Sequence, residues 1–184
     1  MKSTVLISGI GGDIAQGVAT ILRECRPDLR LIGSDIHNNH AGQKWVELVA
    51  ILPKAADKDY VPRLKDIMEK EGVQFFIPMT EAELAVLIGR EDEFAKVRWI
   101  MAGHGVLKAG LDKWETNQAL LRMQVPAPKS SLPPFSDSLE LPCIIKNRFG
   151  SGSRGCAIVY SKEELPFLAQ RQAMLLNTTH QMAS

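Results

Sequence analysis

The fold is decided at residues 4–25, which read TVLISGIGGDIAQGVATILREC. Residues 4–8 form a continuous apolar run, which predicts a buried strand. Glycines interrupt the chain at residues 9–12, and apolar residues then recur at helical spacing from Ile14 to Cys25. A strand, a tight glycine turn and a helix form the opening unit of a parallel α/β sheet.

Strands and helices continue to alternate outward from this unit. Further strands are predicted at residues 29–33, 48–52, 74–77 and 99–101. One helix is expected to begin at Asp57 or Asp59 and to be closed by Gly72. Another begins at a capping box, in which the Thr80 hydroxyl and the Glu83 carboxylate each satisfy a backbone donor. Because parallel neighbours need helical crossovers, we expect a Rossmann-like parallel sheet with helices on both faces.

The pattern changes near residue 111. A second capping box, Asp112 with Glu115, predicts a helix, and a proline-rich connector follows it. Residues 141–146 and 156–160 then predict an antiparallel hairpin, and a final helix is expected from Ser161. We therefore expect two domains, a Rossmann-like domain at residues 1–110 and a small partial α+β lobe at residues 111–184.

Composition excludes several classes of protein. Lys and Arg total 22 against 21 for Asp and Glu, without a basic run, so we expect no nucleic-acid partner. No apolar stretch of about 18 residues and no signal peptide are visible, which predicts a cytoplasmic protein without a membrane partner. The three cysteines form no C-x-x-C pair and are expected to be reduced thiols.

The first candidate site is the glycine turn with Gly9, Gly11 and Gly12. Missing side chains let an anion approach the backbone amides at the positive end of the following helix. Asp35 stands about where a ribose-binding acid lies in a dinucleotide site, although Ile14 breaks the strict fingerprint. Such glycines also permit close packing of strand and helix, and both interpretations stay open.

The second candidate site is the tip of the predicted hairpin. Lys146 ends its first strand, and the tip contains Gly150, Ser151, Gly152, Ser153, Arg154 and Gly155. A loop of glycines, hydroxyls and a guanidinium can bend over a polyphosphate, while Lys146 supplies a point charge. The alternative is a mobile surface hairpin, and the order of residues is not that of a P-loop.

Four further residues are weighed against their ordinary roles. Lys113 lies in the first turn of a capped helix, where a cation opposes the helix dipole, but most lysines are simply exposed. His37 and His40 are spaced like a metal pair, yet no third His, Cys or acid is evident nearby, so no metal is expected. His104 lies between two glycines and is expected in a turn.

In their order along the chain, these motifs resemble the ATP-grasp superfamily. The segments after Asp112 and Lys113, namely VPAP, LPCIIK, GSGSRG and CAIVY, are similar to its first nucleotide-binding lobe. The segments GIGGDIAQG and IPMTEAEL are similar to the preceding domain, and the nearest likeness is to carbamoyl-phosphate synthase large-subunit-like ligases. Asn147 stands where that family usually has proline.

The resemblance implies roles for particular residues. Lys113 and Lys146 would contact the phosphates of ATP, and residues 150–155 would fold over them. The glycine turn, with Asp35, Thr80 and Glu81, would be a possible substrate or anion site. The family's second lobe, with its adenine strand, acidic magnesium ligands and arginine, is not seen in this sequence.

The function implied is an ATP-binding component of a carboxylate–amine ligase, incomplete and inactive alone. ATP is the expected cofactor, with Mg²⁺ only where a complementary lobe supplies ligands, and the carboxylate substrate is not identified. Two alternatives remain, an NAD(P)-binding oxidoreductase or epimerase domain and a non-catalytic oligomeric remnant. The expected partner is a second copy or a complementary ATP-grasp subunit, because Ile144, Ile145, Ile158 and Val159 cannot all be buried by so little chain.

Overall fold

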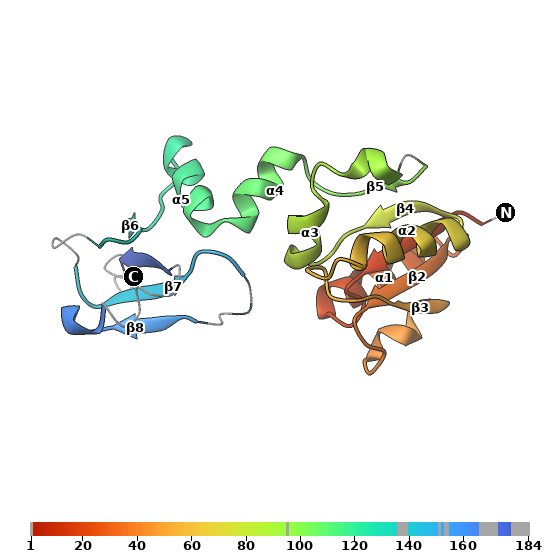
Figure 1. Cartoon of the computed structure of the whole chain (residues 1–184), viewed down its shortest axis with the longest axis horizontal. Coiled ribbons are helices and arrows are strands. Elements are labelled where there is room, and N and C mark those ends of the chain that lie inside the picture. The colour runs from red at the N-terminus through yellow and green to blue at the C-terminus, as the bar shows by residue number, and fades with distance from the viewer. Residues whose placement is uncertain are drawn as a thin grey trace. The chain divides into compact units, whose positions relative to one another are not determined.

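The computed structural model describes residues 2–94, 96–135, 140–150, 152, 155–165 and 173–177. Backbone contacts divide the chain into two compact units, Met1–His104 and Gly105–Ser184 (Figure 1). They are called the first and the second unit below. None of the described helices is both long and apolar enough to cross a bilayer.

A parallel sheet with the strand order β3-β2-β1-β4-β5 forms the centre of the first unit as described. Its strands are β1 (Thr4–Ser8), β2 (Arg30–Asp35), β3 (Leu48–Ile51), β4 (Val73–Ile77) and β5 (Arg98–Trp99). The chain adds β2 and β3 on one side of β1 and then crosses to β4 and β5 on the other. In open α/β sheets, ligands bind beyond the carboxyl ends of the strands at such a reversal.

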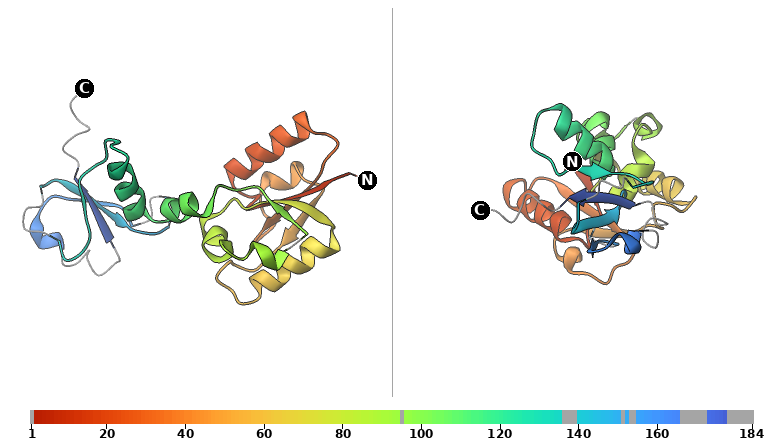
Figure 2. Two further views of the ribbon diagram at one scale, coloured as in Figure 1. Left: turned by 90° about the horizontal axis from the view of Figure 1, so that it is seen from above. Right: turned by 90° about the vertical axis from the view of Figure 1, so that its left-hand side faces the viewer.

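Helices cover both faces of this sheet, as the left view of Figure 2 shows. The helical elements of the unit are α1 (Asp13–Cys25), α2 (Tyr60–Lys70), α3 (Glu81–Leu87) and two 3-10 helices, η1 (Ala41–Lys44) and η2 (Glu91–Phe94). Alternate residues of a strand point to opposite faces, so β1 contributes to two cores. Val5 and Ile7 pack with α1, whereas Leu6 packs with α2. The predicted fold class, a parallel sheet with helices on both faces, is confirmed.

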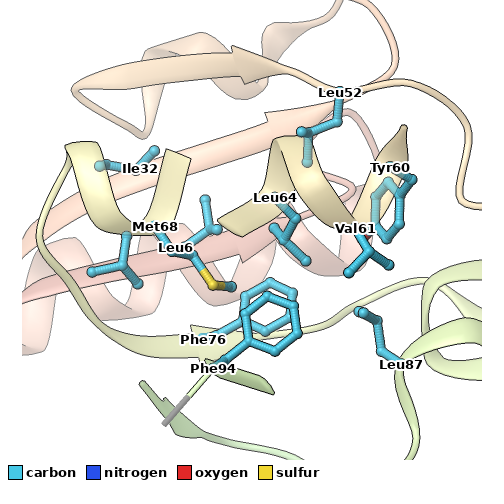
Figure 3. Close-up of a cluster of buried hydrophobic side chains, with 11 residues drawn as sticks. Leu6, Ile32, Leu52, Tyr60, Val61, Leu64, Met68, Phe76, Leu87 and Phe94 are labelled. Atoms are coloured by element: carbon cyan, nitrogen blue, oxygen red, sulfur yellow. The ribbon is translucent and has the colours of Figure 1, made fainter. Parts of the chain in front are cut away.

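The core on the α2 face contains most of the large buried side chains (Figure 3). Leu6, Leu64 and Phe76 have no exposed surface. Burying a side chain of this size stabilises the fold by about 1.5–3 kcal/mol. Trp99 closes the cluster edge-on, with ring centroids 4.9 Å from Phe76 and 5.2 Å from Phe94.

The second unit combines helices with an antiparallel sheet. Its helices are α4 (His104–Leu111), which begins at the last residue of the first unit, and α5 (Lys113–Arg122). In its described part, the sheet order is β6-β9-β7-β8, from β6 (Ser130–Ser131), β7 (Cys143–Asn147), β8 (Ala157–Val159) and β9 (Ala173–Asn177). A small core of Cys143, Ile145 and Val159 holds this sheet.

The predicted hairpin is confirmed by the antiparallel pairing of β7 with β8, in which Cys143 lies opposite Val159. Side chains alternate as expected for a sheet with one covered face: Ile145 and Val159 are buried, Ile144 is half-buried and Ile158 is 54% exposed. The expectation that these four residues are not all buried is therefore confirmed.

Local structure differs from expectation at His104 and at β9. His104 begins α4 instead of lying in a turn, with its Nε2 2.7 Å from Glu91 Oε1. After Ser161 the described chain forms a 3-10 helix, η3 (Lys162–Glu164), and Ser161 makes no side-chain cap; the rest of the helix expected there, at residues 166–172, lies outside the described residues. β9 was not predicted, because a short apolar run in a single sequence does not distinguish a strand from a helix. It pairs along β7 and covers that edge of the hairpin.

Candidate functional site

The glycine turn of the first unit follows β1 and contacts the loop that follows β4. Gly9 adopts φ +59°, and the Gly12 amide donates to the Gly9 carbonyl at 2.9 Å. A Cβ on Gly9 would lie 2.6 Å from Thr80 Cγ2, so a side chain here is excluded by both backbone conformation and space. Two predicted site residues, Gly9 and Thr80, are thus in close contact at the reversal of the sheet.

Asp35 is bound to the same turn. Its Oδ2 accepts the Gly11 amide at 2.8 Å, and its Oδ1 accepts the Ile36 amide at 2.7 Å. The carboxylate therefore fixes the turn after β1 to the end of β2. This structural role for Asp35 does not favour the dinucleotide alternative, in which the acid would be directed to a ribose.

A buried carboxylate lies beneath the turn. Glu83 is 8% exposed, and its Oε2 accepts the hydroxyls of Ser8 at 2.6 Å and Thr80 at 2.7 Å. Its Oε1 accepts the Tyr60 hydroxyl at 2.8 Å. Burial, and then the charge of Glu83, raise the pKa of Tyr60, which keeps the phenol protonated as a donor. Hydroxyls from three separate elements therefore converge on one carboxylate.

This network corrects the predicted capping box. The Thr80 hydroxyl does accept the Glu83 amide, at 3.2 Å. The carboxylate, however, is directed to the three hydroxyls, because it faces the core of the unit and not the free end of the helix. Ser8 and Tyr60 were not predicted as site residues, and the polar Ser8 ending an apolar strand was the signal that could have revealed one of them. Glu81 begins α3 and is exposed.

His37 and His40 lie beside Asp35. One ligand atom from each of these three side chains lies within 4.8 Å of the other two. The expectation that no acid is near the histidines is therefore wrong. The loop after β2 brings His37 and His40 back beside Asp35, the last residue of β2. Asp35 is therefore the third potential ligand of this group.

In the second unit, an ion pair joins the start of α5 to the end of β7. Asp112 accepts the Trp114 and Glu115 amides at 3.0 and 3.3 Å, and so caps α5 as predicted. The same carboxylate accepts Arg148 Nε at 2.8 Å and Nη2 at 2.6 Å. Arg148, more than any other group, lowers the pKa of Asp112. The Asp112 amide donates to the Ala109 carbonyl at 3.2 Å, not to Glu115, so this capping box is also only half formed.

The Asp112–Arg148 pair brings the two predicted lysines together. The Lys113 amide donates to the Arg148 carbonyl at 3.1 Å, and Lys113 Nζ donates to the Gly150 carbonyl. Burial, and then the positive charge of Lys113, lower the pKa of Lys146 on β7. Two ammonium groups from different elements are therefore near enough for their charges to interact.

Glycine shapes the described part of that tip. Gly150, Gly152 and Gly155 have φ values of +94°, +71° and +79°, which other residues rarely adopt. A Cβ on Gly155 would also lie 2.6 Å from the Asn147 side-chain nitrogen. The predicted site residues Ser151, Ser153 and Arg154 lie outside the described residues.

The chemistry of the second unit suits an anion. Two cations and a glycine-rich backbone favour the charge of a polyphosphate, and a lysine whose pKa is lowered by a like charge gains a counter-ion when one binds. Among the described residues, no group of three His, Cys, Asp or Glu side chains lies beside Lys146. A shallow depression in the first unit lies elsewhere, beside α2, where Lys65 and Arg90 each contact Glu93 at 2.6 Å.

The fold is a Rossmann-like parallel α/β unit followed by a unit with a small antiparallel sheet. Residues 5–102 match the family described as PylC-like, N-terminal domain, and the chain belongs to this family. No curated protein sequence matches the chain significantly.

Solved structures extend the likeness over both units. N5-carboxyaminoimidazole ribonucleotide synthetase from Thermotoga maritima aligns with a TM-score of 0.68 at 15% identity, over 96% of this chain and 46% of that one. A second likeness is to the biotin carboxylase domain of 2-oxoglutarate carboxylase from Hydrogenobacter thermophilus, a dimer in complex with MgADP, ADP and bicarbonate. It aligns with a TM-score of 0.71 at 20% identity, over 95% of this chain and 44% of that one. The Staphylococcus aureus N5-carboxyaminoimidazole synthetase complexed with ADP aligns with a TM-score of 0.71 at 14% identity, over 95% of this chain and 47% of that one.

These likenesses establish the fold, and the predicted resemblance to the ATP-grasp superfamily is confirmed. The chain spans less than half the length of these three solved chains. The nearer likeness to carbamoyl-phosphate synthase stays a prediction.

Proposed function

We propose that the chain is the ATP-binding component of an ATP-grasp carboxylate–amine ligase. In this reaction class a carboxylate oxygen attacks the γ-phosphorus of ATP, ADP leaves, and an amine then displaces phosphate from the acyl phosphate. Residues 1–110 would be the preceding Rossmann-like domain, and residues 111–184 the first part of the nucleotide lobe. The chain would supply phosphate contacts, and the remaining part of the clasp would come from polypeptide beyond these residues.

The observation that carries the proposal is the pairing of Lys113 with Lys146. A like charge beside a partly buried ammonium is unfavourable unless an anion joins them, and burial with that charge already lowers the pKa of Lys146. The Asp112–Arg148 ion pair holds the two elements in place while leaving both ammonium groups uncompensated by that pair. Such fixed charges reduce the reorganisation needed when a triphosphate binds.

The hairpin tip would close over the phosphates. Its described glycines at positive φ give the backbone freedom to fold and to present amides to phosphate oxygens. Ser151, Ser153 and Arg154 would add hydroxyl and guanidinium donors, as the resemblance to the superfamily implies. Lys113 Nζ, now bonded to the Gly150 carbonyl, would exchange that bond for a phosphate oxygen.

The first unit would receive the carboxylate substrate. Gly9, Gly11 and Gly12 lie at the reversal of the sheet, where α1 begins, but the Gly11 and Gly12 amides already donate to Asp35 and to the Gly9 carbonyl and would have to exchange these bonds for an anion. Thr80 and Glu81 begin α3 beside them, and Asp35 fixes the turn. The buried Glu83 network would hold both halves of this edge in register.

Phosphoryl transfer also needs Mg²⁺ and a second set of contacts. Positioning and neutralisation of the transferred group provide most of the catalysis in this class. We expect the acidic magnesium ligands to come from a complementary lobe, so the residues shown here would bind ATP without turning it over rapidly. A homodimer or a complementary subunit is the expected assembly, acting in the cytoplasm.

Calorimetric titration of MgATP tests the proposal. The wild-type chain should bind one equivalent, and Lys146→Ala or Lys113→Ala should weaken binding by about tenfold or more, since a hydrogen bond to a charged group contributes about 1.5–3 kcal/mol. Lys129→Ala is the matched control, because Lys129 lies in the same unit with an 82% exposed side chain paired to Glu140. Equal affinity in all four proteins, or no binding by the folded wild type, would refute the proposal.

A further inference from the structure

Asp35, His37 and His40 form a cluster, called the histidine cluster below, at the carboxyl end of β2. Its three ligand atoms lie within 4.8 Å of one another, and the two imidazole rings have centroids 5.6 Å apart. The cluster belongs wholly to the first unit, whereas the lysines proposed to bind ATP belong to the second. It therefore needs an explanation of its own.

The His40 imidazole is the first observation that points to a ligand. Both of its nitrogens are buried, and neither has a hydrogen-bond partner within the part of the chain that the structure describes. Leaving a buried polar atom unpaired costs about 1–3 kcal/mol, so native structures seldom keep one without a reason. A metal ion bound to one of these nitrogens would remove the cost for that nitrogen.

Two glycines hold the His40 ring in place. A Cβ on Gly11 would lie 3.0 Å from His40 Cδ2 and 2.9 Å from Asp35 Oδ2. A Cβ on Gly42 would lie 3.0 Å from His40 Nδ1 and would overlap the Ile10 carbonyl. Gly42 itself is buried in η1. The backbone thus approaches the ring from two separate segments, and any side chain at either glycine would displace it.

The Asp35 carboxylate is oriented in the way that metal ligands usually are. Each of its oxygens accepts one backbone amide, from Gly11 or from Ile36. A carboxylate oxygen has a second lone pair, so both oxygens remain able to bind a cation. Hydrogen bonds of this outer kind fix the direction of a ligand and raise metal affinity.

We propose that Asp35, His37 and His40 bind one zinc ion. Two imidazoles and one carboxylate are a donor set that zinc accepts, with a fourth position left for water or another oxygen ligand. Imidazole donors favour zinc over magnesium and calcium, which prefer sets made of oxygen alone. Bonds of about 2.0–2.1 Å bring ligand atoms nearer than in the metal-free arrangement, and the exposed His37 is free to move inward.

The open coordination position would face the glycine turn. Because Gly11 contacts both Asp35 and His40, a ligand at the turn would also lie near the ion. Zinc would then attract a carboxylate oxygen to the edge of the sheet where the proposed substrate is received. Only this last step rests on the proposed function; zinc binding itself does not.

Titration of zinc chloride into the chelator-treated chain tests the site. Calorimetry should show one equivalent bound, and Co²⁺ should give the visible absorption bands of a four-coordinate site. His37→Ala and His40→Ala should each reduce affinity by about 100-fold or more, since loss of an outer partner alone costs about 10–100-fold. Circular dichroism would confirm folding, and His37→Ala provides the test if the buried His40→Ala variant fails to fold.

Two controls separate this site from adventitious binding. His104→Ala removes a half-exposed histidine of the same unit that pairs with Glu91, and should leave zinc affinity within about twofold, because no cluster contact is lost. A Cys25→Ser and Cys156→Ser double variant removes the two exposed thiols and should do the same. Zinc affinity unchanged by His37→Ala, lost with the thiols, or absent from the folded wild type would overturn the proposal. MgATP binding is measured separately, so each proposal can fail without the other.

Discussion

Replacing Glu83 should destabilise the first unit more than any other single charge change on α3. The carboxylate accepts three hydroxyls, two at Oε2 and one at Oε1. The Ser8 hydroxyl also accepts the Met79 amide at 3.0 Å, and the Thr80 hydroxyl accepts the Glu83 amide. With their acceptor roles filled, both hydroxyls have only the carboxylate to receive their protons.

The magnitude follows from this arrangement. Glu83→Leu leaves the buried hydroxyls of Ser8 and Tyr60 and the partly buried hydroxyl of Thr80 without an acceptor, at about 1–3 kcal/mol each, so we expect a loss of about 4–6 kcal/mol in the free energy of unfolding. Glu83→Gln keeps one oxygen for Ser8 and Thr80 but turns an amide group toward Tyr60, for a loss of about 1.5–3 kcal/mol. The matched control is Glu81→Gln, an exposed change in the same helical turn, expected within about 0.5 kcal/mol of wild type.

Urea unfolding followed by the fluorescence of Trp45 and Trp99, the two tryptophans of the first unit, measures the effect in the correct unit. Trp99 packs on Phe76 and Phe94 in the core that also contains Tyr60, and a Trp114→Phe background removes the signal of the second unit. Tyr60→Phe should cost less in the Glu83→Gln background than in wild type, by about 0.5 kcal/mol or more. A Glu83→Gln protein as stable as Glu81→Gln would refute the network as a source of stability.

Three further predictions concern single side chains. Gly42→Ala should unfold or strongly destabilise the first unit, whereas Gly17→Ala, at an open position in α1, should raise its stability by about 0.5–1 kcal/mol in urea. Asp112 has a lowered folded pKa, so its contribution to stability is present above the unfolded carboxyl pKa and is lost as pH falls through the folded value. Asp112→Asn should remove this acid dependence and cost about 1–2 kcal/mol at pH 6. Trp114 fluorescence, in a background with Trp45 and Trp99 replaced by Phe, reports unfolding of the second unit. Lys146 also has a lowered folded pKa, which means that its charged form destabilises the fold at neutral pH. This destabilisation disappears as pH rises through the folded pKa and the ammonium loses its proton. Lys146→Met should therefore be more stable by about 0.5–1 kcal/mol at pH 7, with a difference that shrinks toward pH 10, while it binds MgATP less well.

The parallel sheet was predictable because its signal is local and repeated. The apolar run of β1, the Gly9 turn and the spacing of α1 each point to the same structure, and Thr4–Ser8 matches the predicted strand in full. The hairpin of β7 and β8 was predictable for the same reason. β9 was not, because its partner in the sheet is about thirty residues earlier and only that pairing distinguishes it from a helix.

The candidate sites, too, contain residues that local motifs predicted and residues that they did not. Lys113, Lys146 and Gly150 were predicted from the order of motifs, and the structure brings these three together. The Arg148–Asp112 ion pair that positions them was not, since nothing in the sequence assigns one arginine to one aspartate 36 positions away. Side chains directed to one point by different strands cannot be inferred from spacing alone.

The two missed features of the first unit have a common physical origin. Glu83 was interpreted through its own helix, and the histidines through their own loop, so each was judged by residues near it in sequence. In a parallel sheet, however, the loops that follow adjacent strands meet at one edge, and Ser8, Asp35 and Thr80 each follow or end such a strand. Polar residues at those positions should therefore be considered as one set. Considered together, they place the Glu83 carboxylate network on one side of the Gly9–Gly12 turn and the cluster of Asp35, His37 and His40 on the other, and spacing within one segment could predict neither.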